Sequence, residues 1–226
     1  MSATLATVAT MVAATANPVH NKVTLYGTNH LLVTPPQGTV INVYRNIVQT
    51  FSHHIIDITP GATTILIQPK TSQLQTFIKL LEHAKPQTDL PNHTRIQQHF
   101  IPVIYNGVDL PHVGKTLNMR VETVIQLFET ATFTVGFHGF TPGFSYLTGL
   151  PNPLNQILRH PAPRSSVPSG SVALAAGYAA IYPRTTPGGW NLIGHTKHPM
   201  FNTATGPSFN IGDTVKFVRS VDDIHS

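Results

Sequence analysis

The sequence predicts an α+β protein with a small N-terminal α/β sandwich domain and a larger C-terminal β domain. Helix-like apolar spacing alternates with short β-branched runs up to about residue 88, which is the pattern of a compact α/β sandwich. A polar, proline-broken stretch (KPQTDLPN, 85–92) then indicates a linker. From Ala131 onward, short apolar runs alternate with long Gly- and Pro-rich loops, which is typical of a β-barrel or sandwich. The predicted units are a disordered extension (1–20), an N-terminal α/β domain (21–90) and a β-barrel domain (91–226).

The N-terminal elements follow from local apolar patterns. Apolar residues three to four positions apart predict helices, and runs rich in Ile, Val and Thr bounded by Gly or Pro predict strands. In order, these patterns predict two strands around a turn at Gly27 (22–34), a helix (40–51), two strands split by Pro60-Gly61 (55–59 and 63–68) and a second helix (74–81).

The C-terminal elements are mostly strands. Residues 99–105 (HFIPVIY) form a predicted strand, and two short helices are expected over 109–117 and 119–129 with Asn118 between them. The remaining predicted strands cover 131–138, 171–176, 178–182, 190–194 and 214–218.

Composition limits the classes of function. Only 10% of the residues are charged, well below the usual quarter, so either a partner covers part of the surface or the surface is rich in Thr, Asn and Gln. The net charge of +5 arises from nine acids against fourteen bases, without the Lys/Arg clustering that marks nucleic-acid binding. The absence of cysteine excludes disulfides and thiolate catalysis. No apolar stretch reaches transmembrane length, and the N-terminus lacks the basic region of a signal peptide. We therefore expect a cytoplasmic protein that binds neither nucleic acid nor membrane.

The segment from Gly139 to Thr196 is the most informative part of the chain. It contains three blocks in which Gly and Pro alternate with aromatic residues, Arg and Ser: GFTPGFSYLTGL, PRSSVPSGSVALAAG and IYPRTTPGGWNLIGHT. Such blocks form rigid loops whose backbone can approach a ligand closely, and they predict the rim of a pocket. No Asp or Glu occurs between Glu129 and Asp213, so the counter-ions of this cationic segment must come from a ligand, a partner chain or the preceding part of this chain.

Individual residues of this segment suggest chemistry. Arg164, stiffened by neighbouring prolines, can either bind an anion or hold a loop carbonyl. Ser169 and Ser171 flank Gly170 and can stabilise a turn or form a small oxyanion nest. Because the segment has no carboxylate, the candidates for acid–base catalysis are His138 and His195, ahead of tyrosine hydroxyls.

The residues present disfavour three other chemistries. A phosphate-binding loop ending at Gly114-Lys115 would need Gly where Asp109 stands. A nucleophile elbow around Ser145 would need Gly where Leu147 stands. His195 and His198 have no neighbouring carboxylate in the sequence, so we predict no metal and no covalent cofactor in this chain.

The three blocks resemble one family. They match, in order, the patterns GF-x-PGF-x-YL-x-GL, PR-x-x-VP-x-GSVA and IYP-x-x-x-PGGW-x-x-IG-x-T. The chain is similar, from about Lys22 to Val218, to the family of 5-oxoprolinase B subunits, which are carboxyltransferase C and D domains. The same family includes allophanate hydrolase subunit 1 and Kip-type inhibitors of a sporulation histidine kinase. The resemblance implies a small N-terminal α/β domain followed by a cyclophilin-like β-barrel.

The resemblance also implies an activity. It implies a hydrolase subunit that acts on a small anionic or amide substrate and opens 5-oxo-L-proline to L-glutamate in an ATP-dependent reaction. The implied partners are a large carboxyltransferase-like subunit (the C-type subunit, or allophanate hydrolase subunit 2) and the A-type subunit. ATP would bind at the level of the complex, and the chain alone would be inactive. The alternatives are an inhibitor of a sensor histidine kinase and an allophanate or urea-pathway hydrolase subunit.

The family motifs map onto a set of expected substrate-binding residues. These are Gly139, Phe140, Pro142, Gly143, Phe144, Tyr146, Arg164, Pro168, Gly170, Ser171, Tyr182, Gly188, Gly189, Trp190 and Thr196. The chain departs from the family at three places: Phe128 stands where His is usual, His195 stands where Arg is usual, and Gly27-Thr28 replaces Gly-Asp.

Overall fold

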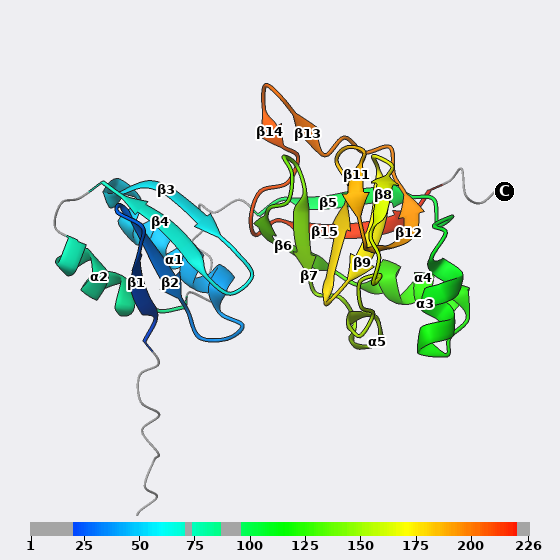
Figure 1. Ribbon diagram of the computed structural model, residues 1–226, viewed down its shortest axis with the longest axis horizontal. Helices are drawn as coiled ribbons and strands as arrows, with labels where there is room; N and C mark the ends of the chain where they lie inside the picture. Colours follow the sequence, from blue (N-terminus) through cyan, green and yellow to red (C-terminus); the bar gives the residue numbers. More distant parts are fainter. Residues whose placement is uncertain (1–19, 71–73, 87–95, 221–226) are drawn as a thin grey trace, which may run out of the picture.

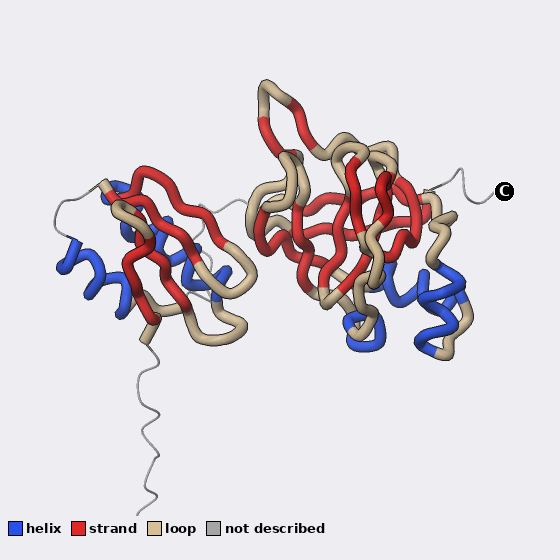
Figure 2. The backbone as a smooth tube through the Cα atoms, viewed as in Figure 1, coloured by secondary structure: helices blue, strands red, loops and turns tan. Residues whose placement is uncertain are grey.

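The computed structural model describes residues 20–70, 74–86 and 96–220 (Figure 1). The predicted disordered extension, apart from His20, and most of the predicted linker lie outside the described residues. Figure 2 shows the strands gathered into two separate groups, each accompanied by helices. The predicted α+β class is confirmed. None of the described helices is long and apolar enough to cross a membrane.

The N-terminal part is a four-stranded antiparallel sheet of order β1-β2-β4-β3. Its elements are β1 (Lys22–Tyr26), β2 (His30–Thr34), α1 (Val40–Phe51), the 3-10 turn η1 (Ser52–His54), β3 (Ile55–Pro60), β4 (Ile65–Pro69) and α2 (Leu74–Glu82). Alternate strand residues such as Leu31 and Ile67 are buried, and they meet Ile47 of α1 and Phe77 of α2 in one core. Both helices therefore cover the same face of the sheet. Every predicted element of this region is present.

The C-terminal part is a seven-stranded sheet of order β12-β9-β10-β7-β6-β15-β5. Its strands are β5 (Gln98–Val103), β6 (Phe133–His138), β7 (Ser145–Thr148), β9 (Ser171–Ala175), β10 (Tyr178–Ile181), β12 (Asn191–His195) and β15 (Thr214–Arg219). The sheet curls until its edges meet, where the amides of Ile104 and His195 each donate to the carbonyl of the other at 2.9 Å. This pair closes the sheet into a barrel, so neither edge strand is left open at this point.

Two helices, α3 (Leu110–Leu117) and α4 (Val121–Thr130), lie at one end of the barrel in Figure 1. Asn118 adopts a left-handed conformation between them (φ 52°), where its amide donates to carbonyls of α3. Phe128 of α4 is fully buried, with its ring 4.7 Å from that of Phe217 and 4.9 Å from that of Phe133. The departure from the family at position 128 thus falls in the core, where Phe fills the end of the barrel.

The aromatic blocks contain strands that sequence reasoning assigned to loops. These are β7, β8 (Arg164–Val167) and β11 (Thr186–Gly188). Outside the blocks, the short helix α5 (Asn152–Asn155) and the short hairpin of β13 (Phe201–Asn202) and β14 (Gly206–Pro207) also do not follow from the sequence patterns. β8 and β11 pair only with each other, with an irregular register between Thr186 and Gly188. Neither β8 (Arg-Ser-Ser-Val) nor β11 (Thr-Pro-Gly) carries the apolar alternation by which strands are predicted.

Asp213 is a buried carboxylate that joins the start of β5 to the turn before β15. It accepts hydrogen bonds from the Gln97 amide (3.0 Å), the Asn210 amide (2.9 Å) and the His99 imidazole (2.9 Å). Burial raises the pKa of Asp213, but the hydrogen bonds from His99, Asn210 and Gln97 outweigh it and hold this pKa below its usual value.

The lowered pKa of Asp213 predicts a loss of stability in acid. The stabilisation is present above the unfolded-state pKa of about 3.9 and disappears as the pH falls through the lower folded-state pKa. We expect Asp213→Asn to lower the free energy of unfolding by about 1–3 kcal/mol at neutral pH and to flatten its pH dependence below about pH 4. Urea unfolding at stepped pH tests this, with the exposed Asp57→Asn as control. Equal pH slopes for wild type and Asp213→Asn would contradict it.

Candidate functional site

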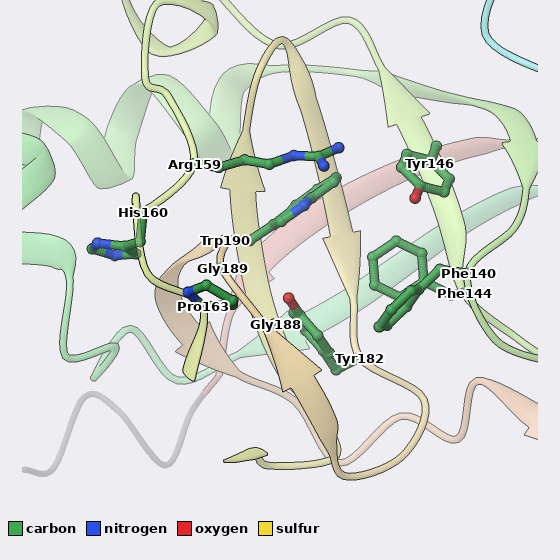
Figure 3. A pocket seen from close by; sticks show the side chains of 10 residues that line it. All are labelled: Phe140, Phe144, Tyr146, Arg159, His160, Pro163, Tyr182, Gly188, Gly189 and Trp190. Carbon is green, nitrogen blue, oxygen red and sulfur yellow. The ribbon is translucent and has the colours of Figure 1, made fainter. Parts of the chain in front are cut away.

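A pocket of about 280 Å³ opens on one side of the barrel between β7, β11 and the loop before β8 (Figure 3). The loops of the three aromatic blocks supply most of its walls. It is lined by Phe140, Phe144, Tyr146, Arg159, His160, Pro163, Tyr182, Gly188, Gly189 and Trp190. We call this the aromatic pocket. The structure thus brings together seven of the expected substrate-binding residues, all from the first and third blocks.

The aromatic rings of this pocket meet edge to face. The Phe144 ring lies 5.3 Å from Tyr182 and 5.6 Å from Trp190, and the Tyr146 ring lies 5.7 Å from Trp190. Such contacts fix the rings in one arrangement. Burial raises the pKa of both Tyr146 and Tyr182, so both hydroxyls stay protonated near neutral pH and can donate hydrogen bonds.

Phe140 forms the rim of the pocket. It has a positive φ of 65°, which is unfavourable for an aromatic residue, yet 61% of its surface is exposed. The turn that holds it is closed by hydrogen bonds from the Thr141 amide to the Gly139 carbonyl (2.7 Å) and from the Phe144 amide to the Thr141 carbonyl (2.9 Å). A strained, exposed aromatic at the mouth of a cavity is a common feature of binding sites.

Gly188 is required by the Tyr182 ring. A Cβ at position 188 would collide with the Tyr182 hydroxyl and lie 2.9 Å from its Cε1, whereas a Cβ at Gly189 would have no neighbour nearer than 3.5 Å. We expect Gly188→Ala to displace the ring and destabilise the protein by about 1–3 kcal/mol, and Gly189→Ala to have little effect. Urea unfolding of the two variants tests this. Equal losses of stability would show that the contact with Tyr182 is not the reason why position 188 needs glycine.

Arg164 does not line the pocket. Its Nη2 donates to Oδ1 of the buried Asp109 at 2.7 Å, and its Nη1 donates to the Trp190 carbonyl at 3.4 Å. Asp109 also accepts from the Leu192 amide (2.7 Å) and lies 3.3 Å from His160 Nε2. The counter-ion of Arg164 is therefore an earlier residue of the same chain, and the guanidinium holds the start of β12 in place.

Arg159 is the cation that faces the pocket. Figure 3 shows its guanidinium extending over the face of Trp190, with Cζ 5.8 Å from the ring centroid. Arg159 belongs to the cationic segment between Glu129 and Asp213, but it lies outside the three blocks and is not among the expected substrate-binding residues. The signal was its position five residues before Arg164 in the same proline-rich stretch.

The two histidine candidates are not brought together. His138 Nδ1 lies 3.0 Å from the hydroxyl of the buried Ser145, and burial lowers the pKa of His138, so its imidazole is neutral at pH 7. His195 and Thr196 instead line a second cavity of about 300 Å³ where β12 meets β5. Gly170 packs against His195, since a Cβ at position 170 would lie 2.7 Å from His195 Nε2.

The remaining expected residues shape loops. Gly143 (φ 84°) lets the first block pack on the β13 hairpin, because a Cβ there would lie 2.7 Å from Phe201 Cβ. Ser171 is buried, and its amide closes a turn on the Pro168 carbonyl (3.3 Å). Within the described ranges, no three His, Asp or Glu side chains converge as a metal site would require.

For ligand binding, the aromatic pocket offers apolar walls, the neutral hydroxyls of its tyrosines as hydrogen-bond donors, and one guanidinium.

Comparison with known proteins identifies relatives of the chain. Residues 16–210 match the family described as carboxyltransferase domain, subdomain C and D. The chain is 44% identical over 123 residues to the B subunit of 5-oxoprolinase from Haemophilus influenzae, and 34% identical over 179 residues to the B subunit of 5-oxoprolinase from Escherichia coli O157:H7. These matches cover 52% and 76% of this chain, and they span 57% and 81% of the respective relatives.

Solved structures share the fold. A crystal structure of a protein named TTHA0988 superposes with a TM-score of 0.69 and 26% identity, covering 84% of this chain but 40% of that one. The urea amidolyase of Kluyveromyces lactis superposes with a TM-score of 0.68 and 14% identity, covering 92% of this chain but 15% of that one. In both, the region equivalent to this chain is a minor part of a longer polypeptide.

Proposed function

Because the chain belongs to the carboxyltransferase family of subdomains C and D, we propose that it is the B-type subunit of an ATP-dependent 5-oxoprolinase. In this proposal it acts with a large carboxyltransferase-like subunit and with a third, A-type subunit to open 5-oxo-L-proline to L-glutamate. ATP binds at the level of the complex, and the chain alone is inactive. The observation that carries the proposal is the aromatic pocket, whose lining matches the chemistry of this substrate in a chain similar to two proteins of that name.

The pocket and the substrate are complementary. 5-Oxo-L-proline is a small, flat lactam ring with one carboxylate. The faces of Trp190 and Phe144 suit the ring, and the Arg159 guanidinium suits the carboxylate, because Arg pairs with carboxylates through two parallel hydrogen bonds. The Tyr182 hydroxyl, kept protonated by burial, can donate to the lactam oxygen.

The pocket lacks the groups that would hydrolyse an amide unaided. Its lining includes no carboxylate and no Ser or Thr, and the Nε2 atom of its one histidine, His160, lies 3.3 Å from Oδ1 of Asp109. A lactam carbonyl is unreactive until its oxygen becomes a leaving group. Transfer of the terminal phosphoryl group of ATP to that oxygen achieves this: ADP leaves, water attacks the carbon, the ring C–N bond breaks as the nitrogen takes a proton, and a second water hydrolyses the resulting acyl phosphate to the carboxylate and free phosphate. We assign substrate binding to this chain and the base to one of its partners.

The surface around the pocket supports a partner. Phe140, Leu158 and Phe201 are exposed by 61%, 76% and 40%, and the cationic segment between Glu129 and Asp213 contributes no acid of its own. Apolar side chains rimmed by polar and basic groups are typical of interaction surfaces. The longer chains of the two structural relatives agree with an arrangement in which this fold works beside another unit.

Reconstitution tests the proposed function. The chain is co-expressed with the large carboxyltransferase-like subunit and the A-type subunit of the same organism, and glutamate released from 5-oxo-L-proline is measured with and without ATP. We expect co-purification with the large subunit, and glutamate release only when all three chains and ATP are present. A stable complex that releases no glutamate, or a chain that alone blocks autophosphorylation of a sensor histidine kinase, would contradict the proposal.

A further inference from the structure

A cluster of three aromatic rings lies behind one wall of the aromatic pocket. Phe137 of β6 stacks flat on Tyr146 of β7, with ring centroids 4.3 Å apart and ring planes 13° apart. Tyr178 of β10 meets both rings edge to face, at 5.6 Å from Phe137 and 5.7 Å from Tyr146. We call these three residues the ring triad. Of the three, Tyr146 alone lines the aromatic pocket, so the other two contact its wall from behind.

A β-bulge brings Phe137 into the ring triad. In the pairing of β6 with β7, Val135 stands opposite Leu147, and both are buried in the barrel core. The next opposed pair is Phe137 and Tyr146, which leaves Gly136 as an extra residue on β6. Without this extra residue, regular alternation would place Gly136 opposite Tyr146 and turn Phe137 toward the core. Bulges are frequent beside active sites, where they redirect a side chain, and this bulge directs Phe137 onto a ring of the pocket wall.

The Tyr146 ring is held between the ring triad and the pocket. On the pocket side it meets Phe144 at 5.1 Å and Trp190 at 5.7 Å, in both cases edge to face. On the other side, the flat stack with Phe137 fixes the plane of the ring. Burial raises the pKa of Tyr146, and the charge of Arg159 acts against it, so Tyr146 lies within the field of the guanidinium assigned to the substrate carboxylate. A change in the plane of Tyr146 therefore alters the wall beside that guanidinium.

The other side of the ring triad faces the N-terminal part of the chain. Phe137 and Tyr178 line a cleft of about 270 Å³, which we call the interdomain cleft. Its remaining lining comes from the barrel strands β6 and β7, from the start of α1 and from the turn between β3 and β4: Gly38, Val40, Ile41, Gly61, Ala62, Thr134, Gly136 and Thr148. The ring triad thus lies between the aromatic pocket and the N-terminal part.

We propose that Phe137 is a positioning residue of the aromatic pocket, which acts through the Tyr146 ring and does not touch the substrate. Phe137 lies outside the three sequence blocks and does not line the pocket, yet the bulge places its ring flat against Tyr146. Tyr178 supports the stack from its edge. The role in substrate binding rests on the proposed function, because 5-oxo-L-proline is the ligand concerned, whereas the effect on the Tyr146 ring does not.

The emission of Trp190 in the full chain tests the placement of the ring without any substrate. Trp190 is the only tryptophan, and the Tyr146 ring lies 5.7 Å from it, so a displaced Tyr146 changes its emission. We expect Phe137→Leu to change the emission when Tyr146 is present and to leave it unchanged in a Tyr146→Leu background. Phe137→Tyr, which keeps a flat ring, should retain the wild-type emission. The control is Phe100→Leu, the same change at an exposed position on β5, which should have no effect.

Steady-state kinetics of the reconstituted complex test the consequence for substrate binding. We expect Phe137→Leu to raise the KM for 5-oxo-L-proline about two- to tenfold at unchanged kcat, since the stack that orients one wall is lost. Phe137→Tyr should retain the wild-type KM. In the Tyr146→Leu background, Phe137→Leu should raise KM no further, because its effect passes through Tyr146. A melting curve of each variant separates these effects from a general loss of stability.

Equal effects of Phe137→Leu with and without Tyr146, in emission or in KM, would show that Phe137 acts on the fold at large and would overturn the proposal. Unchanged emission in Phe137→Leu would overturn it as well, and so would an unchanged KM. Failure of the proposed function is a separate result. A complex that releases no glutamate contradicts that function, while the emission of the chain alone still decides whether Phe137 positions Tyr146.

Discussion

Replacing Arg159 by Gln is expected to raise the KM of the reconstituted enzyme for 5-oxo-L-proline by about ten- to a hundredfold. The Arg159 guanidinium is the charged group that faces the aromatic pocket, and it extends over Trp190 without an acidic partner in the pocket lining. A charge-assisted hydrogen bond contributes about 1.5–3 kcal/mol, which corresponds to this range of affinity. The melting temperature should stay unchanged. Steady-state kinetics of the complex, together with a melting curve of the chain, measure both effects.

Arg184→Gln is the matched control. Arg184 is exposed and outside both cavities, so the same loss of charge there should leave KM unchanged. Equal effects of the two substitutions would mean that the net charge of the surface, rather than the geometry of the pocket, governs substrate binding. An unchanged KM in Arg159→Gln would remove Arg159 from the site.

Replacing Asp109 by Ala is expected to lower the free energy of unfolding by about 3–5 kcal/mol. The side chain of Asp109 is 8% exposed, accepts a 2.7 Å hydrogen bond from Arg164 and another from the Leu192 amide, and joins the start of α3 to β12. Its removal leaves a partly buried guanidinium and a buried amide without their acceptor, which is the most costly way to break such a pair. Urea unfolding at neutral pH measures the loss.

Arg164→Ala distinguishes a structural role from a binding role for this pair. Because Arg164 holds the Asp109 carboxylate and the Trp190 carbonyl, we expect Arg164→Ala to lose stability, in contrast to Arg159→Gln. If Arg164→Ala instead lost activity at an unchanged melting temperature, Arg164 would be a ligand-binding residue, as the sequence alone allows. Asp109→Asn, which keeps an acceptor for Leu192, should lie between wild type and Asp109→Ala.

The elements that the sequence predicted are those whose pattern is local. Apolar spacing alone indicates α1, and β-branched runs indicate β3 and β4, because one face of each packs on a single core. The strands of the aromatic blocks were not predicted, because they lack a local pattern of this kind. In β8 and β11 the pairing is short and irregular, and neither the Arg-Ser-Ser-Val of β8 nor the Thr-Pro-Gly of β11 has the alternation that marks a half-buried strand.

The candidate site was predictable in part. The recurring Gly, Pro and aromatic residues indicated a pocket, and the structure brings Phe144, Tyr182 and Trp190 to its walls. The different roles of Arg159 and Arg164 were not predictable, because Arg164 is held by Asp109, which lies 55 positions before it in the sequence. The same holds for His195, which the closure of the barrel at Ile104 places in a different cavity. Long-range pairings of this kind leave no periodic signal in the chain.

The fluorescence of Trp190 provides the most direct test of the central claim, that the aromatic pocket binds the substrate. Trp190 is the only tryptophan of the chain and lines the pocket. The emission of the reconstituted complex is titrated with 5-oxo-L-proline, and the signal of a complex carrying Trp190→Phe is subtracted to isolate this residue. We predict a saturable change in Trp190 emission with a midpoint close to the KM, shifted to higher concentration in Arg159→Gln. A complex that turns over 5-oxo-L-proline while Trp190 emission stays constant would contradict the assignment of this pocket.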